Sequence, residues 1–215
     1  MDHPSPHAAD PAAHQARLAR LAEVAIRVGL NLQPDQELVM TAPIAALPLA
    51  RLITDAAYRA GATVVTTLFA DDQQTLSRFQ HARAETFDHA AGWLYDGMAA
   101  AFRHGAARLA IVGDDPNLLA GQDAGLIARA NRARAQAYRP ALELITTSAI
   151  NWSLVPYAVP AWARAVFPEA PEAEALARLW QAIFAATRVD TADPVAAWAA
   201  HNAALMTRRR MLTER

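Results

Sequence analysis

Two pairs of adjacent aspartates, Asp71-Asp72 and Asp114-Asp115, directly follow apolar segments of this 215-residue sequence. Each pair stands where a strand is expected to end, and ligands of open α/β sheets bind beyond the carboxyl ends of the strands. Carboxylates that lie close together can bind a hard cation or share a proton. Aspartate is also a good helix N-cap, and Pro116 suits the first position of a helix. We therefore expect the four aspartates to be mainly caps, and consider them cleft-facing or ligand-binding candidates second.

A second candidate site contains histidine. His81 and Glu85 are four residues apart, and Asp88 and His89 follow, a grouping that could bind zinc if all four side chains faced one point. A solvated helical surface explains the same spacing more simply. His104 precedes a glycine, so an imidazolium there would meet the negative end of a helix dipole. The sequence therefore assigns no catalytic residue and no metal ligand.

Two common catalytic and cofactor-binding motifs are missing from the sequence. The loop after the first expected strand, TAPIAALP, contains no glycine that would let backbone amides approach a pyrophosphate, which argues against dinucleotide binding of the Rossmann type. A glycine-poor variant stays open. No Gly-x-Ser-x-Gly nucleophile elbow occurs. Cysteine is absent, so carboxylate and imidazole are the only metal ligands to consider.

The composition restricts the partners and the location. With 20 Lys+Arg against 21 Asp+Glu and a net charge of -1, no overall field attracts the protein to nucleic acid or to an anionic membrane. No stretch approaches the ~20 apolar residues that span a bilayer. Residues 1–13 lack the cationic start and apolar centre of a signal peptide and are predicted to be a disordered tail. We expect a cytoplasmic protein with no membrane and no nucleic-acid partner.

The periodicity of apolar residues predicts alternating strands and helices. Gly29, Gly61 and Gly105 are expected to end the first three helices. Strands that alternate with amphipathic helices indicate an α/β fold, with an open, mostly parallel sheet of about four strands and helices on both faces. The expected helices cover residues 12–28, 45–60, 89–104 and 122–137, and the expected strands cover residues 37–43, 63–69, 108–113 and 152–157.

An all-helical segment follows the last expected strand. Proline-bounded residues 159–168 predict a short helix, residues 171–187 a longer one, and Asp193-Pro194 the start of a third. This last helix carries no Gly, Pro or polar turn as a stop signal. We expect one α/β domain over residues 14–215 and, from the missing stop signal, further chain beyond it.

Five segments, in this order, resemble the N-terminal domain of the thermophilic-type metalloaminopeptidases, the aminopeptidase T, aminopeptidase S and PepS group. The resemblance runs from about Leu18 to Leu205. It implies a protein of roughly twice this length, whose C-terminal domain binds two divalent metals, zinc or cobalt, through Glu, His, Tyr and Asp side chains. The segments are VGLNLQPDQELVMTAP, LARLITDAAYRAGA, WLYDGMAAAFRHGAARLAIVGDDPNLLAG, INWSLVPYAVPAWARAVFP and LWQAIFAATRVDTADPVAAWAAH.

None of the segments contains a residue of that metal centre, so no catalytic or metal-binding role is transferred to this sequence and no cofactor is expected in it. The resemblance implies a non-catalytic half of a metal-dependent aminopeptidase, inactive alone, whose partners are the catalytic C-terminal domain and, in the full enzyme, a peptide substrate. The alternative is a stand-alone Rossmann-like module. Such a module would bind a small ligand at the strand ends or form a homodimer through the tryptophan-bearing C-terminal helices.

Overall fold

A single parallel sheet forms the centre of the computed structural model, which describes residues 10–214. The strand order is β2-β1-β3-β4, and all three strand pairs are parallel. The predicted α/β fold with four mostly parallel strands is thus confirmed. The strands are β1 (Leu38–Pro43), β2 (Val65–Ala70), β3 (Ala107–Val112) and β4 (Trp152–Pro156).

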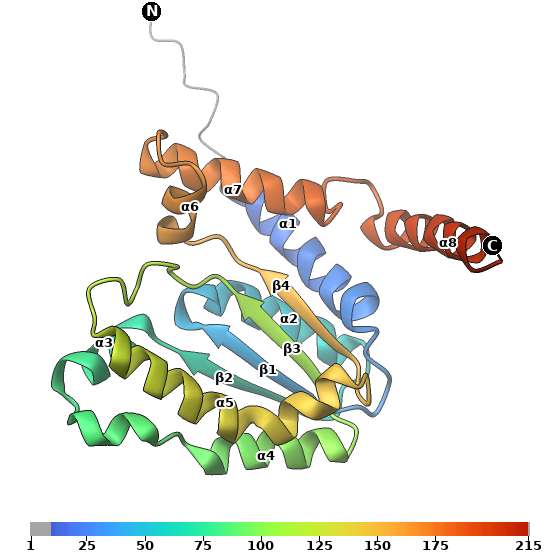
Figure 1. Cartoon of the computed structure of the whole chain (residues 1–215). Coiled ribbons are helices and arrows are strands. Elements are labelled where there is room, and N and C mark those ends of the chain that lie inside the picture. Colours follow the sequence, from blue (N-terminus) through green and yellow to red (C-terminus); the bar gives the residue numbers. More distant parts are fainter. Residues whose placement is uncertain (1–9, 215) are drawn as a thin grey trace, which may run out of the picture.

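Helices cover both faces of the sheet (Figure 1). Helices α1 (Pro11–Val24) and α2 (Leu47–Arg59) lie behind it in this view, and α4 (Gly92–Arg103) and α5 (Ala124–Thr146) lie in front of it. The connection β1-α2-β2 leads outward on one side, whereas β3 returns to the other side of β1. The strand order therefore reverses between β1 and β3, which makes their carboxyl ends the switch point of the fold.

Alternation along the strands separates two cores. In β1, Leu38 and Met40 belong to the large core behind the sheet, whereas Val39 belongs to a smaller core in front of it. The front core lies at the amino-terminal half of the sheet, because Val39 pairs with Arg108 near the start of β3. Thr41, two residues further along on the same face, lines an open hollow instead. The front of the sheet is therefore packed at one end only.

Three helices follow the sheet, as the all-helical segment predicted. They are α6 (Pro160–Val166), α7 (Glu172–Ala186) and α8 (Pro194–Thr213). Helix α8 extends away from the rest of the molecule (Figure 1), and of its residues only Pro194 is buried. Within residues 10–214, no helix has the length and apolar character needed to cross a membrane.

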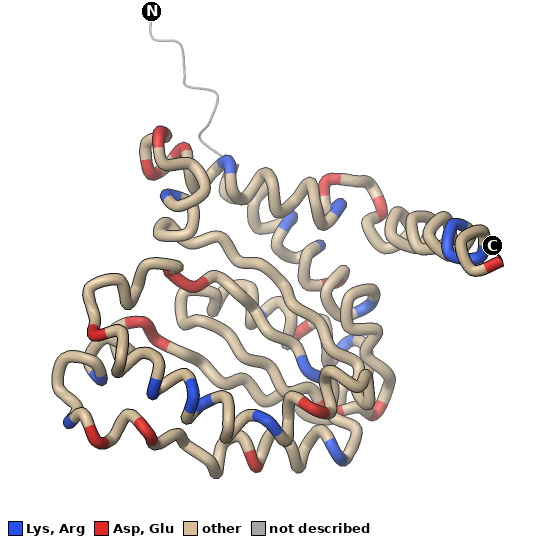
Figure 2. Tube along the Cα trace, in the orientation of Figure 1, with Lys and Arg blue, Asp and Glu red and all other residues tan. Residues whose placement is uncertain are grey.

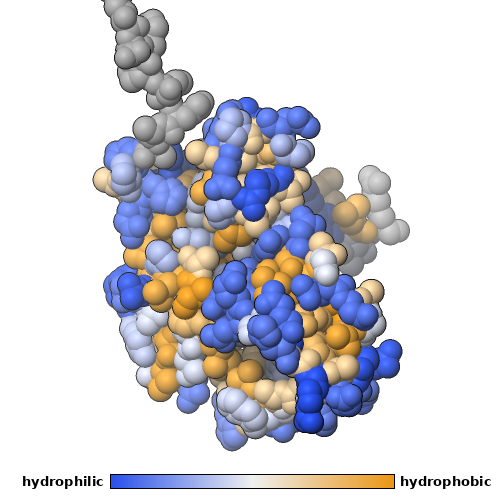
Figure 3. Space-filling model, turned by 90° about the vertical axis from the view of Figure 1, so that its left-hand side faces the viewer, coloured by the Kyte–Doolittle hydropathy of each residue, from blue (hydrophilic) through white to orange (hydrophobic). Residues whose placement is uncertain are grey.

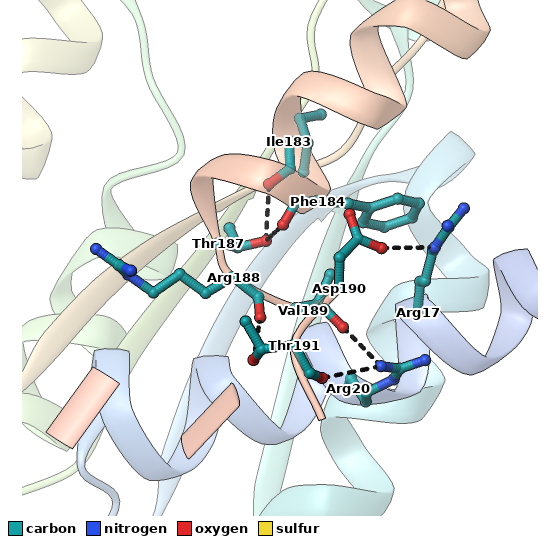
Figure 4. Close-up of polar contacts among 9 residues, drawn as sticks. All are labelled: Arg17, Arg20, Ile183, Phe184, Thr187, Arg188, Val189, Asp190 and Thr191. Carbon is teal, nitrogen blue, oxygen red and sulfur yellow. Dashed lines mark hydrogen bonds and ion pairs between the residues drawn. The ribbon is translucent and has the colours of Figure 1, made fainter. Parts of the chain in front are cut away.

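Polar contacts connect the loop after α7 to α1 (Figure 4). The guanidinium of Arg20 donates to the backbone carbonyls of Val189 at 2.8 Å and Thr191 at 3.2 Å. Arg17 pairs with Asp190 at 2.8 Å beside them. Because the Val189 side chain is fully buried, these contacts fix a loop that is also part of the large core.

The helix boundaries differ from the prediction at both ends of α1. Helix α1 begins at Pro11, with Asp10 as its N-cap, so residues 11–13 lie in its first turn although the predicted tail included them; residues 1–9 of that tail lie outside the described part of the chain. Gly29 was expected to end this helix, and this was wrong: a π-helical turn, Ala25–Leu30, continues through it. Asn31 provides the left-handed residue instead, with φ 51°.

The other two glycine stops are confirmed. Gly61 and Gly105 follow α2 and α4 with φ values of 96° and 89°, a region that L side chains disfavour. Helix α4 begins at Gly92 rather than at residue 89. Helix α5 continues through Pro140 to Thr146, nine residues past the predicted end, because its last turns bury Ala141 and Ile145 in the front core.

Two elements lie between β2 and α4, where the sequence predicted a cap at Asp71 or Asp72 but no helix bounds. Helix α3 (Asp72–His81) has no buried residue, and a 3₁₀ helix, Ala84–Asp88, buries only Phe87. Its two apolar side chains, Leu76 and Phe79, are only half-buried, so α3 has a short apolar stripe for a helix.

Candidate functional site

The sheet brings the two aspartate pairs together at its carboxyl end. Asp71-Asp72 follow β2 and Asp114-Asp115 follow β3, the two strands on either side of β1. Burial raises the pKa of Asp72 most, and the charges of Asp114, Asp115 and Asp71 raise it further. The four carboxylates thus form one acidic group, in which Asp72 resists ionisation more than a free aspartate does. Figure 2 shows acidic segments on neighbouring loops at this end of the sheet.

Two of the four carboxylates bond to the backbone next to them. Asp71 caps α3 by accepting from the Gln73 backbone N–H at 3.0 Å, which confirms its predicted role. Asp115 accepts from the Asn117 backbone N–H at 2.8 Å.

No helix begins at Asp115, however, so its prediction as a helix N-cap was wrong. The residues after it form consecutive turns, with the Leu118 N–H bonded to the Asp115 carbonyl. Helix α5 begins at Ala124, and Asp123 caps it by accepting from the Leu126 N–H at 2.9 Å. Asp115 and Pro116 suit the first residues of a turn as well as those of a helix, and the sequence does not distinguish the two.

The adjacent residues Asp114 and Asp115 line two different hollows. Asp114 lines a hollow of about 760 Å³ between the front of the sheet and helices α4 and α5, which we call the sheet hollow. Asp115 lines a second one of about 480 Å³, together with Asp71, Asp72 and Arg164 in the last turn of α6, which we call the acidic hollow. Apolar residues interrupt the hydrophilic surface around the carboxyl end of the sheet (Figure 3). A cleft-facing or ligand-binding role of the four aspartates stays a prediction.

Gly113, directly before the second aspartate pair, allows two backbones to approach closely. A Cβ atom at this position would lie 2.2 Å from the Tyr157 carbonyl oxygen, closer than real Cβ contacts come. The Tyr157 N–H in turn donates to the Val112 carbonyl at 2.8 Å, which extends the pairing of β3 with β4. This glycine therefore serves the contact between strand ends rather than the binding of a phosphate.

The four-residue zinc candidate is not assembled. The Asp88 carboxylate binds Arg129 of α5 instead, with Nε at 3.0 Å and Nη2 at 2.6 Å, and these bonds lower the pKa of Asp88. His104 bonds through Nδ1 to the Ala100 carbonyl at 2.8 Å in the last turn of α4, consistent with a structural role.

A two-metal centre does not fit the donors present. Over residues 10–214, no group of three or more His, Asp or Glu side chains is arranged to hold a metal ion. The acidic group supplies carboxylates alone, two of which already accept backbone N–H bonds. We therefore derive no catalytic step through a metal held by these residues.

Sequence reasoning missed four polar residues of the sheet hollow, Arg108, Asn131, Arg134 and Tyr138. Arg108 donates through Nε to the Tyr138 hydroxyl at 3.0 Å, and Tyr138 packs against Tyr95 at 5.6 Å between ring centres. One feature of the sequence could have indicated Arg108. Arg108 is the only charged residue of β3, a strand that is otherwise apolar.

Residues 14–215 match the model of a protein family described as thermophilic metalloprotease (M29). Aminopeptidase T of Thermus thermophilus is 53% identical to the chain over 193 residues, which cover 90% of this chain and 47% of that protein. Aminopeptidase T of Thermus aquaticus is 51% identical, covering 92% and 48%. Aminopeptidase 2 of Geobacillus stearothermophilus is 39% identical, covering 87% and 46%.

A solved structure of wild-type AmpT from Thermus thermophilus superposes with a TM-score of 0.81 at 52% sequence identity, covering 87% of this chain and 46% of that one. The shared fold thus extends over most of this chain. The chain spans about half the length of the curated relatives it matches.

Proposed function

The chain belongs to the thermophilic metalloprotease (M29) family, and we propose that it forms the amino-terminal, non-catalytic half of a metal-dependent aminopeptidase. One observation supports this most strongly: about nine-tenths of the chain aligns with about half of each aminopeptidase relative. The donor set agrees with it, since the acidic group at the strand ends offers no histidine for a two-metal site.

In this proposal the two divalent metals, zinc or cobalt, belong to the other half of the enzyme. The half described here supports the chamber in which a peptide loses its N-terminal residue, and the loops after β2 and β3 face that chamber. Asp71, Asp72, Asp114 and Asp115 would then give the chamber a negative wall, which attracts the free α-ammonium group of a peptide. The absence of cysteine from the sequence supports a cytoplasmic location.

The test is an assay of the purified 215-residue chain on an aminoacyl chromogenic substrate, with cobalt or zinc added. We expect no turnover above that of the metal alone. The aminopeptidase T of Thermus thermophilus, assayed in the same buffer, serves as the positive control. The proposal would be overturned by activity that follows the chain through purification and is abolished by Asp114→Asn. Such activity would place the reaction at the strand ends.

A longer chain tests the other part of the proposal, that the second half of the enzyme is catalytic. It extends this chain by any coding sequence that follows Arg215 in the gene. The extended chain should hydrolyse the substrate in a metal-dependent way. An extended chain that binds two metals yet remains inactive on aminoacyl substrates would count against an aminopeptidase.

A dimerisation module is the second candidate, and the exposed side of α8 favours it. Leu205, Met206, Met211 and Leu212 are between 43% and 76% exposed on this helix. Apolar side chains so placed can pack against a second copy. Sedimentation of the wild-type chain and of Leu205→Glu across a concentration range tests this candidate: only the wild type should associate, and a wild type that remains monomeric contradicts it.

A further inference from the structure

The sheet hollow has the form of a binding site that adjoins the acidic hollow at Pro43 and Ala70 but has different charged residues in its lining. Its volume of about 760 Å³ lies within the range of about 300–1,000 Å³ that small-molecule sites occupy. It exists because the front core fills only the amino-terminal half of the sheet, so α5 spans an unfilled space over the other half. Its apolar walls include Leu68, Met98, Ala110, Val112, Leu142 and Leu154.

Two guanidinium groups face this apolar space. Arg108 reaches it from β3, where its Nε donates to the Tyr138 hydroxyl at 3.0 Å, and Arg134 reaches it from α5, with Nη2 at 3.5 Å from the Asn131 amide oxygen. Among the ion pairs of residues 10–214, none involves either arginine. Two cations without carboxylate partners beside apolar walls are complementary to an anion that carries an apolar body.

The two arginines lie near the same end of the sheet hollow. Arg108 bonds to the Tyr138 side chain, and Arg134 is one helical turn, about 5.4 Å, from Tyr138, so both arginines lie beside Tyr138. Asp114 is six residues beyond Arg108 on β3 and its following loop, roughly 20 Å away in an extended chain. Its charge therefore lies at the opposite end of the hollow and leaves the two arginines unneutralised.

We propose that the sheet hollow binds a small apolar carboxylate, with the carboxylate between Arg108 and Arg134 and the carbon chain along the apolar walls toward Val112. Guanidinium binds carboxylate with two parallel hydrogen bonds, which gives the site its preference for this group over an alcohol or an amine. The site requires no residue outside this chain and does not depend on aminopeptidase activity.

Calorimetric titration of the 215-residue chain with octanoate, octanol and octylammonium tests the charge preference. The three probes share one apolar chain and differ in the head group. Octanoate should bind at least about tenfold more tightly than octanol, because a charge-assisted pair is lost in the alcohol. Octylammonium should bind more weakly than octanol. Equal affinity for octanoate and octanol, or no binding of octanoate, overturns the proposal.

Matched variants on α5 locate the site. Arg134→Gln should weaken octanoate binding about tenfold or more, while Arg132→Gln, exposed on the same helix but outside the hollow, should leave it within about twofold. Ala135→Trp, an exposed wall residue, should block binding by filling the space, whereas Gln136→Trp should not. Equal effects within either pair contradict the assignment.

A further titration distinguishes the source of the carboxylate. N-acetyl-leucyl-leucine carries the same head group at the end of a peptide, so tighter binding than octanoate would identify a peptide carboxyl terminus as the ligand, and weaker binding a fatty acid. Either result requires the site. Octanoate affinity that falls as the protein concentration rises would instead assign the hollow to a second copy of the chain and overturn the proposal.

Discussion

Replacement of Gly113 by alanine should destabilise the domain more than any other glycine-to-alanine change in it. The new Cβ would lie 2.2 Å from the Tyr157 carbonyl oxygen, roughly 1 Å short of a normal carbon–oxygen contact. The strand ends must separate by about that distance, which breaks the bond from the Tyr157 N–H to the Val112 carbonyl. The lost hydrogen bond costs about 0.5–1.5 kcal/mol, and the forced backbone shift costs about 1–3 kcal/mol.

We therefore expect a loss of about 2–4 kcal/mol in the free energy of unfolding. For a domain of this size, that corresponds to a fall of about 5–15 °C in Tm, measured by calorimetry or circular dichroism. Gly97→Ala is the matched control, because its Cβ meets no atom within 4 Å in the exposed side of α4. It should raise stability by about 0.5–1 kcal/mol. If Gly113→Ala is as stable as Gly97→Ala, the close approach at the strand ends is not a constraint.

Three further predictions concern the helices around the sheet. Arg20→Ala should lower the free energy of unfolding by about 1–2 kcal/mol, because two backbone carbonyls lose a charged donor. Arg17→Ala removes an exposed ion pair and should cost less than about 1 kcal/mol. Urea unfolding of the two variants measures the difference. Burial and the charge of Arg17 lower the pKa of His14 below 6.5, so the unfolded chain binds a proton that the folded one does not. Stability should accordingly fall as the pH drops through 6.5 toward the lowered pKa, and urea unfolding of His14→Gln should show a smaller fall. Trypsin should cleave first at Arg208–Arg210, where α8 has no buried residue, and earlier cleavage within the sheet would contradict the local weakness of this helix.

The strands could be predicted because burial on both faces leaves a continuous apolar run. ELVMTAP and RLAIVG have this composition, and β1 and β3 are indeed covered by helices in front and behind. Helix α3 could not be predicted from its apolar residues, because it buries none of them. Its start depends on the Asp71 cap, which the sequence did indicate. Beyond Pro140, the continuation of α5 depends on the burial of Ile145 among residues distant in the sequence.

The assembly of the acidic group could also be predicted, at a coarse level. Parallel strands place their carboxyl ends at one edge, so residues that follow β2 and β3 must come close whatever their identity. The orientation of each aspartate side chain could not be predicted, because it depends on how the chain leaves each strand. Asp115 begins a series of turns instead of a helix, and this exit directs it into the acidic hollow while Asp114 lines the sheet hollow.

The position of α5 explains why the two hollows exist side by side. Because Asp123 rather than Asp115 caps α5, the helix begins several residues beyond the end of β3. No residue of the first turns of α5 lines the sheet hollow, and the first two that do, Asn131 and Arg134, are polar. A helix that began at Pro116 would place different residues over the sheet. The loop that carries Asp114 into one hollow and Asp115 into the other therefore also sets which α5 residues line the sheet hollow.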